Sequence, residues 1–337
     1  QDGKSSSHVP ALIWKSSGAE VILLELVRRS FIAPVDPCQY NLQQVIVGVG
    51  KYTRGTTSML FPIFYGIIAP DIATPKSLGA MKTAIGLAAK LDGQLSVAIG
   101  ALEISVRNTL SSGIVDRVVA EEGQRSRESA KALSGQIADL ARGSGSAVHT
   151  EILSGSLGQI SGQCAVRARI HGLVFAEAGG PSEPLTGALI EPLLFESGRP
   201  VIVVPNGFSS EISLSHILIA WDGSDGAARA VWDAIPLLRQ ANTLEIATVV
   251  GEKELDEVPA ANALAGMLTF LGKKITVTPL AFDGNTAAGL IKQHAARTSA
   301  GLVVQGAYGR SRWSELILGG VTREMLHDCA LPVLMSH

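Results

Sequence analysis

A glycine-rich segment near the end of the chain has the residue types that bind phosphate. Residues 302–305 have strand character and lead into Gly306 and Gly309, which are three residues apart. Nine residues further on, the pair Gly319-Gly320 opens an amphipathic run. Glycine leaves backbone N–H groups open to a ligand, and a helix N-terminus adds unpaired N–H donors with partial positive charge. The pattern therefore predicts a strand, a phosphate-binding loop and a helix start.

Glycines that follow a strand also serve ordinary turns, so a ligand-free turn is the alternative interpretation of this segment. A second turn carries a carboxylate, in Asp222-Gly223-Ser224 after the apolar stretch 217–220. Asp222 has two interpretations as well, because an aspartate at a strand-to-helix turn either contacts a ligand or caps the helix.

Strand-like apolar runs alternate with amphipathic helical runs from residue 61 onward. The expected strands are 61–69, 94–101, 147–153, 173–175, 201–204, 217–220, 244–250, 275–282, 302–305 and 333–335. The expected helices are 77–91, 121–142, 157–170, 185–196, 227–239, 259–271, 286–299 and 321–327. Strands separated by helices require a parallel sheet with right-handed crossovers, whose ligand sites lie beyond the carboxyl ends of the strands. The glycine segment stands at one such end.

The order of elements occurs twice, which indicates an internal duplication. Gly172-Leu173-Val174 parallels Gly301-Leu302-Val303, and Pro200-Val201-Ile202 parallels Pro332-Val333-Leu334. The sequence thus predicts an α/β protein with two five-stranded parallel sheets, in domains 58–207 and 213–337. Residues 1–57 show no sustained period. We expect an N-terminal extension there, whose origin as a natural segment or a leader stays open.

Composition narrows the class of protein and its partners. The 337 residues are 46% apolar and only 17% charged, as expected when helices cover both faces of a sheet. A net charge of -2 without a basic run disfavours nucleic acid and anionic lipid. The longest apolar run, 59–70, is too short to span a membrane. The cysteines Cys38, Cys164 and Cys329 are too far apart for a zinc site or a disulfide framework, so we expect no metal site and a cytoplasmic protein.

The spacing from Gly306 to Thr322, between a strand and Pro332-Val333-Leu334, resembles the signature of the universal stress protein family. Asp222-Gly223-Ser224 matches the family's aspartate followed by small residues. The resemblance covers 210–337 well and 60–207 more weakly. It implies a tandem universal stress protein, with two copies of a Rossmann-like α/β sandwich of the adenine-nucleotide α hydrolase type. In the family the last strand of one copy commonly pairs with that of another, which here implies an intramolecular pseudo-dimer, with a homodimer left open.

Nucleotide-binding members of the family hold ATP, with Mg²⁺, against this loop. By resemblance Asp222 and the backbone of Val249 lie beside adenosine, and Gly306 lies near the ribose. The residues implied around the phosphates are Gly309, Gly319, Gly320, Val321 and Thr322. Gly320 departs from the family, which usually has Ser or Thr there. Unless Thr322 supplies a hydroxyl, ATP binding should weaken several-fold, since one neutral hydrogen bond is worth about 0.5–1.5 kcal/mol.

The first copy has different residues at the same positions. Aligning Val174 with Val303 puts Glu177 at the position of Gly306 and Gly180 at that of Gly309, followed by prolines. A carboxylate repels phosphate, and proline lacks the N–H that would bind it. We expect the first copy to bind no nucleotide and to have a structural or regulatory role.

The resulting hypothesis is a stress-response binding protein whose second domain holds ATP or a related adenine nucleotide. No general base is identifiable, so we name no catalytic residue and expect slow hydrolysis at most. Two alternatives stay open: a nucleotide hydrolase or transferase of the same fold group, and a ligand-free protein-interaction module.

Overall fold

A computed structural model gives the chain an α/β fold around one mixed, mostly parallel sheet. It describes residues 63–68, 78–103, 113–178, 184–208, 210–251, 257–307, 320–328 and 330–337. The expected N-terminal extension, 1–57, lies outside the described residues. Within the described part, no helix combines the length and the apolar character needed to cross a membrane.

Strands and helices alternate along the chain as expected. The first half contains β1 (Ile63–Ile68), α3 (Gly79–Lys90), β2 (Gln94–Leu102), α4 (Gly113–Ser144), β3 (Val148–Gly155), α5 (Leu157–Ala168), β4 (Leu173–Glu177), α6 (Pro184–Glu196) and β5 (Val201–Val204). The second half contains β6 (His216–Ala220), α7 (Asp225–Leu238), β7 (Thr243–Val250), α8 (Glu257–Leu268), the 3-10 turn η4 (Thr269–Leu271), β8 (Lys274–Ala281), α9 (Ala287–Thr298), β9 (Leu302–Gly306), α10 (Gly320–Asp328) and β10 (Val333–Ser336). Every expected strand and helix is present, and most differ from the expectation at one end or both.

The largest shift is in α4, which has 32 residues and begins eight positions before the expected 121. Its first turns expose Val115 and Val118, so no buried stripe marks them in the sequence. Further along, the hydroxyl of Ser126 accepts a hydrogen bond from the N–H of Leu102 at 2.9 Å. This contact attaches the middle of α4 to the end of β2.

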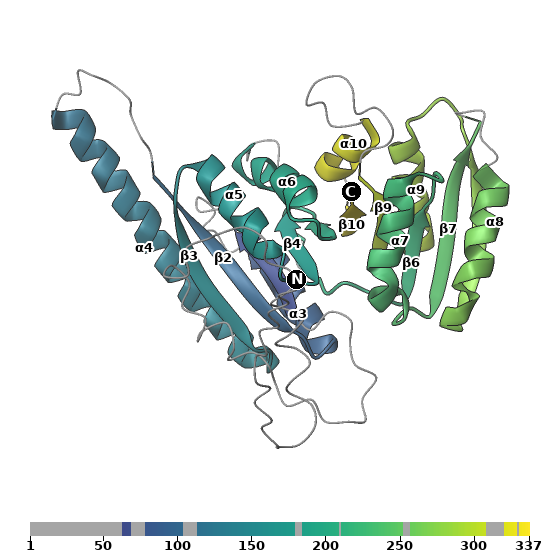
Figure 1. The fold of residues 1–337 in the computed structure, drawn as a ribbon, viewed down its shortest axis with the longest axis horizontal. Helices are drawn as coiled ribbons and strands as arrows, with labels where there is room; N and C mark the ends of the chain where they lie inside the picture. The colour runs from purple at the N-terminus through teal and green to yellow at the C-terminus, as the bar shows by residue number, and fades with distance from the viewer. Residues whose placement is uncertain are drawn as a thin grey trace, which may run out of the picture. The chain divides into compact units, whose positions relative to one another are not determined.

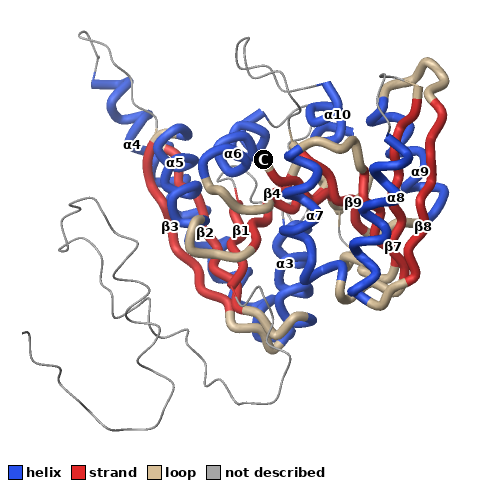
Figure 2. The backbone as a smooth tube through the Cα atoms, turned by 45° about the vertical axis from the view of Figure 1, so that its right-hand side comes forward, coloured by secondary structure: helices blue, strands red, loops and turns tan. Residues whose placement is uncertain are grey.

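The strands form one sheet in the order β3-β2-β1-β4-β5-β10-β9-β6-β7-β8 (Figure 1; strands in red in Figure 2). All neighbours are parallel except β5 and β10, which are antiparallel. The expected pairing of the two final strands is therefore present. Ile202 lies opposite Leu334 at its centre, and both side chains are fully buried. The prediction of two separate parallel sheets is therefore wrong, because this antiparallel pair makes the strands one continuous sheet.

The pairing registers on the two sides of β5 and β10 correspond strand by strand. In the first half, Phe64 of β1 lies between Leu95 of β2 and Leu173 of β4. In the second half, Ile217 of β6 lies between Leu244 of β7 and Leu302 of β9 in the same way. One residue further along, Val174 pairs with Val201, and Val303 pairs with Val333. Positions in one half therefore have defined counterparts in the other.

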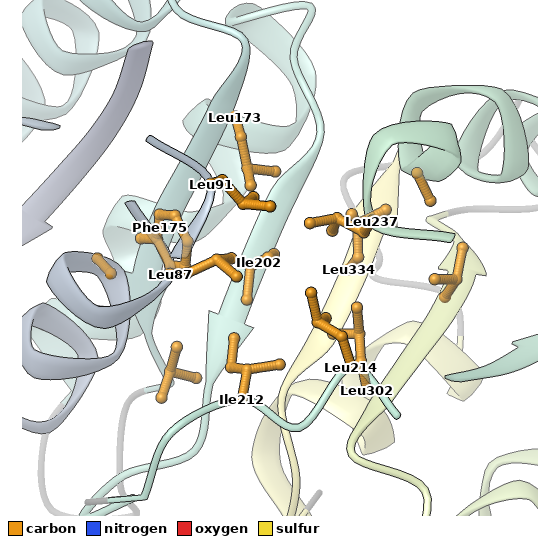
Figure 3. Close-up of a cluster of buried hydrophobic side chains, with 14 of the residues drawn as sticks. Leu87, Leu91, Leu173, Phe175, Ile202, Ile212, Leu214, Leu237, Leu302 and Leu334 are labelled. Atoms are coloured by element: carbon orange, nitrogen blue, oxygen red, sulfur yellow. The ribbon is translucent and has the colours of Figure 1, made fainter. Parts of the chain in front are cut away.

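Each face of the sheet is covered by its own set of helices, because side chains alternate between the faces along each strand. Buried residues of α3, α4, α7 and α8 pack on one face, and those of α5, α6, α9 and α10 pack on the other. Figure 3 shows the first of these cores around Ile202 and Leu334, with leucines of β4, β9 and α7 beside them. Two apolar layers thus enclose the sheet on both sides of β5 and β10.

A buried polar cluster holds β6, β7, β8 and α9 together away from the carboxyl ends of the strands. Glu245 of β7 accepts hydrogen bonds from Thr278 at 2.6 Å and from His294 Nε2 at 2.7 Å. Its second carboxylate oxygen lies 3.1 Å from His216 Nε2. Burial alone would raise the pKa of Glu245, but the hydrogen bonds from Thr278 and His294 hold that pKa below its ordinary value.

The neighbours of the two histidines set which ring nitrogens carry protons. Arg297 contacts His294 Nδ1 at 2.7 Å, and a guanidinium only donates, so Nδ1 accepts and Nε2 donates to Glu245. His216 Nδ1 lies 3.1 Å from the carbonyl oxygen of Thr298, and its Nε2 faces the carboxylate. Both ring nitrogens of His216 therefore lie beside oxygen atoms that can accept a hydrogen bond.

The β5–β10 pairing predicts a specific disulfide. With Cys38, Cys164 and Cys329 replaced, Ile202→Cys with Leu334→Cys should form an intramolecular disulfide on mild oxidation, because directly opposed Cβ atoms lie about 4.5–5.5 Å apart. Mass spectrometry of the digested protein would detect the linked peptides. The control, Val203→Cys with Met335→Cys, is off register and should link poorly. Equal linkage of both pairs would contradict the register.

The Glu245 cluster predicts a pH-dependent stability. Because the folded pKa of Glu245 is lowered, its ionised form stabilises the fold above the ordinary value of 4.5, and that contribution disappears as the pH falls through the folded pKa. The difference in unfolding free energy between wild type and Glu245→Gln should therefore shrink as urea denaturation is repeated from pH 7 down to pH 3. The exposed control Glu121→Gln should show no such trend. A difference for Glu245→Gln that grows on acidification would contradict the sign.

Candidate functional site

The turn between β6 and α7 is fixed by two side-chain contacts. Asp222 Oδ1 accepts the N–H of Ser224 at 3.0 Å, across Gly223, which has a positive φ of 72°. The hydroxyl of Ser224 in turn accepts the N–H of Ala227 at 3.1 Å and is the N-cap of α7. The capping role considered for Asp222 therefore belongs to Ser224. Asp222 itself is exposed, so its carboxylate remains open to a ligand.

Gly306 ends β9 directly against the first turn of α7. A Cβ added there would lie 2.5 Å from the backbone nitrogen of Ala227 and 2.6 Å from the carbonyl carbon of Gly226. These distances are too short for any side chain, so this position requires glycine. The neighbouring Ala307 donates its N–H to the carbonyl oxygen of Ser336 at 2.7 Å. The sequence-predicted Asp222 and Gly306 are thus brought to one edge of the sheet by α7.

Val249 lies beyond the end of β6. The last paired residues of β6 and β7 are Ala220 and Ala247, whereas β7 continues to Val250 beside β8. Val249 is half-buried. Val249 thus stands at the carboxyl end of β7, near the Asp222 turn.

The start of α10 lies after β9 in the chain, and its first three residues are Gly320, Val321 and Thr322. Val321 is exposed, whereas Thr322 is buried, with 3% of its surface accessible. The hydroxyl expected from Thr322 is therefore turned into the protein. The first N–H groups of a helix have no intrahelical partner, so Gly320 and Val321 still offer backbone donors. Gly309 and Gly319 lie outside the described residues.

α10 is fastened to α9 through Glu324. Its carboxylate contacts Lys292 Nζ at 2.8 Å and accepts the hydroxyl of Thr286 at 2.7 Å. Lys292, followed by Thr286, holds the pKa of Glu324 below its ordinary value. Thr286 is itself the N-cap of α9, so one carboxylate links α10 to the start of its neighbour.

The corresponding place in the first half is filled differently. Glu177, the counterpart of Gly306, is buried, and its Oε1 accepts the N–H of Gly207 at 3.3 Å. Gly207 belongs to the segment that leaves β5 and has a φ of 72°. A carboxylate bound to the chain's own backbone thus occupies this position. Gly180 and the prolines after it lie outside the described residues.

Four residues near these strand ends were not among the predicted site residues: Trp221, Thr248, Gln305 and Ser336. Each has side-chain polar atoms that are buried without a hydrogen-bond partner in the part of the chain the structure describes. The available signal was a polar residue at the end of an otherwise apolar strand, as Gln305 is in Leu302–Gly306. For metal ions, no group of three or more His, Cys, Asp or Glu residues within the described ranges is suited to hold one.

Comparison with known proteins gives a family model, Universal stress protein family, that matches residues 214–337. No curated protein matches the chain. Among solved structures, the chain is similar to a universal stress protein from Archaeoglobus fulgidus DSM 4304, with 14% identity and a TM-score of 0.62 over 81% of this chain and 97% of that one. It is also similar to a candidate universal stress protein of Pseudomonas aeruginosa UCBPP-PA14, with 18% identity and a TM-score of 0.47 over 83% and 95%. A universal stress protein in complex with cAMP matches 42% of this chain and 97% of its own, with 18% identity and a TM-score of 0.31.

The likeness to the Archaeoglobus protein concerns the fold and extends over most of the chain. The family model covers the half that contains Asp222, Gly306 and α10. Residues 214–337 are therefore a universal stress protein domain.

Proposed function

We propose that the chain is a stress-response protein whose domain 213–337 binds ATP or a related adenine nucleotide. The observation that carries this proposal is the arrangement at the carboxyl ends of the strands. The exposed carboxylate of Asp222 comes just before the first turn of α7, and Gly306 lies directly against that turn. A second helix, α10, begins after β9 with backbone donors. Ligands of open α/β sheets bind at such strand ends.

We also propose that residues 58–207 are a second, degenerate universal stress protein domain, so that the chain is a tandem protein. The matching strand order and registers on the two sides of β5 and β10 support this duplication. The antiparallel β5–β10 pair supports an intramolecular pseudo-dimer of these two domains. The wide spacing of the three cysteines favours a cytoplasmic location.

In this proposal Asp222 and the backbone of Val249 contact adenosine, and Gly306 lies beside the ribose. The phosphates, with their Mg²⁺, lie against Gly309, Gly319, Gly320, Val321 and Thr322. Because the side chain of Thr322 is buried, its contribution is its backbone N–H rather than its hydroxyl. The exposed Asp222 fits a ligand hydroxyl or amino group, since a carboxylate accepts strong hydrogen bonds.

The first domain is proposed to hold no nucleotide. At the position of Gly306 it has Glu177, whose carboxylate is bound to the N–H of Gly207. A buried negative charge there disfavours phosphate, and the chain's own backbone already uses the acceptor. In this proposal the first domain has a structural role, because its strands complete the sheet and the pseudo-dimer.

Binding of ATP by the purified chain tests the proposal. Isothermal titration with Mg-ATP should give one site per chain, and Asp222→Ala should weaken it about ten- to a hundredfold, because a hydrogen bond to a charged group is worth about 1.5–3 kcal/mol. The matched control is Asp283→Ala, which removes an aspartate that accepts the N–H of Asn285 at 3.0 Å in the turn before α9. This control should bind as wild type does.

Absence of heat and of a melting shift at millimolar ATP would reject nucleotide binding and leave the ligand-free interaction module. Steady phosphate release that is abolished in Asp222→Ala would instead favour the hydrolase.

A further inference from the structure

Four residues at the carboxyl ends of the second half carry buried polar atoms without partners. The atoms are Trp221 Nε1, Thr248 Oγ1, Ser336 Oγ and both amide atoms of Gln305. Thr248, Gln305 and Ser336 are 1%, 4% and 1% exposed. Within the described ranges, no first-half residue has such an atom. Burial of an unpaired polar group destabilises a fold, so a cluster of four requires a cause.

The four side chains surround Gly306. Ser336 is paired with Gly306 on β10, and Gln305 precedes it on β9. Trp221 and Thr248 each follow the last paired residues of β6 and β7, Ala220 and Ala247, so they are neighbours across the sheet. By strand alternation Trp221, Thr248 and Ser336 share the face covered by α7 and α8, and Gln305 lies on the opposite face. Polar groups therefore lie near Gly306 on both faces of the sheet.

The first half supplies an internal comparison. The strand registers make Ile68 the counterpart of Trp221, Ile99 of Thr248, Ala176 of Gln305 and Val204 of Ser336. All four counterparts are apolar. The fold thus accepts apolar residues at these positions, and the polar ones occur only in the half with the glycine segment. Polar side chains at these four positions are therefore not required by the fold itself.

We propose that Trp221, Thr248, Gln305 and Ser336 recognise the nucleoside part of the ligand, a purine base and its ribose. This inference rests on the proposed nucleotide function. All four side chains are neutral, and three of them both donate and accept hydrogen bonds. A base edge and ribose hydroxyls also present donors and acceptors together, whereas a phosphate presents only acceptors and is usually met by cationic side chains or backbone N–H groups.

Solvent reaches the immediate neighbours of these atoms. Asp222, next to Trp221, is exposed, and Val249, next to Thr248, is half-buried. A nucleoside held by Asp222 and Val249 therefore lies one residue from two of the unpaired groups. The proposal therefore requires side chains next to Asp222 and Val249 to move when the nucleoside binds.

The experiment uses near-isosteric apolar replacements in the full chain. Thr248→Val and Gln305→Met should keep or raise the melting temperature of the ligand-free protein, because they remove unpaired polar atoms. Affinity for ATP and for adenosine should fall about three- to tenfold for Thr248→Val and about tenfold for Gln305→Met. Affinity for inorganic tripolyphosphate should not change.

The matched control is Thr83→Val. Thr83 is 2% exposed, but its hydroxyl donates to the carbonyl oxygen of Ser210 at 3.2 Å. Its replacement should lower the melting temperature and leave adenosine affinity unchanged. The two threonines thus differ in whether the hydroxyl has a partner within the protein.

Four results overturn the inference. A lower ligand-free melting temperature with unchanged adenosine affinity would assign the groups to internal hydrogen bonds, for instance through buried water. An equal loss of tripolyphosphate and ATP affinity would assign them to phosphate. If wild type binds neither ATP nor adenosine, the proposed function fails together with the inference, whereas wild-type binding that the variants retain overturns the inference alone.

Discussion

The close approach of the first turn of α7 to Gly306 determines the geometry of the candidate site. With the Ala227 nitrogen 2.5 Å from where a Cβ would stand, β9 and α7 meet without any side chain between them. The same turn is capped by Ser224 and carries Asp222 just before it. One glycine therefore sets the distance between the end of β9 and the carboxylate that follows β6. A side chain there would move α7, and with it the Asp222 turn.

The two halves of the sheet share their strand order and registers but differ at this position. In the first half, Glu177 stands at the position of Gly306. Its carboxylate accepts a hydrogen bond from the N–H of Gly207, so the segment after β5 contacts the end of β4. The second half keeps glycine there and places unpaired polar side chains around it. The antiparallel pair of β5 and β10 joins the two halves, because its residues are buried and apolar on both faces. The two halves therefore differ at these strand ends in charge and in hydrogen bonding.

Much of the fold could be predicted from the sequence because its signals are local. Apolar runs such as Val201–Val204 and amphipathic helices marked every strand and helix, and the repeated Gly-Leu-Val and Pro-Val segments indicated the shared strand order. The start of α4 was missed because Val115 and Val118 are exposed there. The reason for Gly306 was also missed, since contact with α7 is a tertiary property. The Glu245 cluster joins residues 216, 245, 278 and 294, which no local pattern connects.

The asymmetry between the halves is the central claim, and an NMR titration of the full chain with Mg-ATP tests it most directly. Backbone amide shifts should change at Gly306, Ala307 and the first turn of α10, with saturation at one equivalent. The amides of Glu177 and Ala178, at the corresponding place in the first half, should not move. Equal shifts in both halves, or shifts confined to the first, would contradict the account.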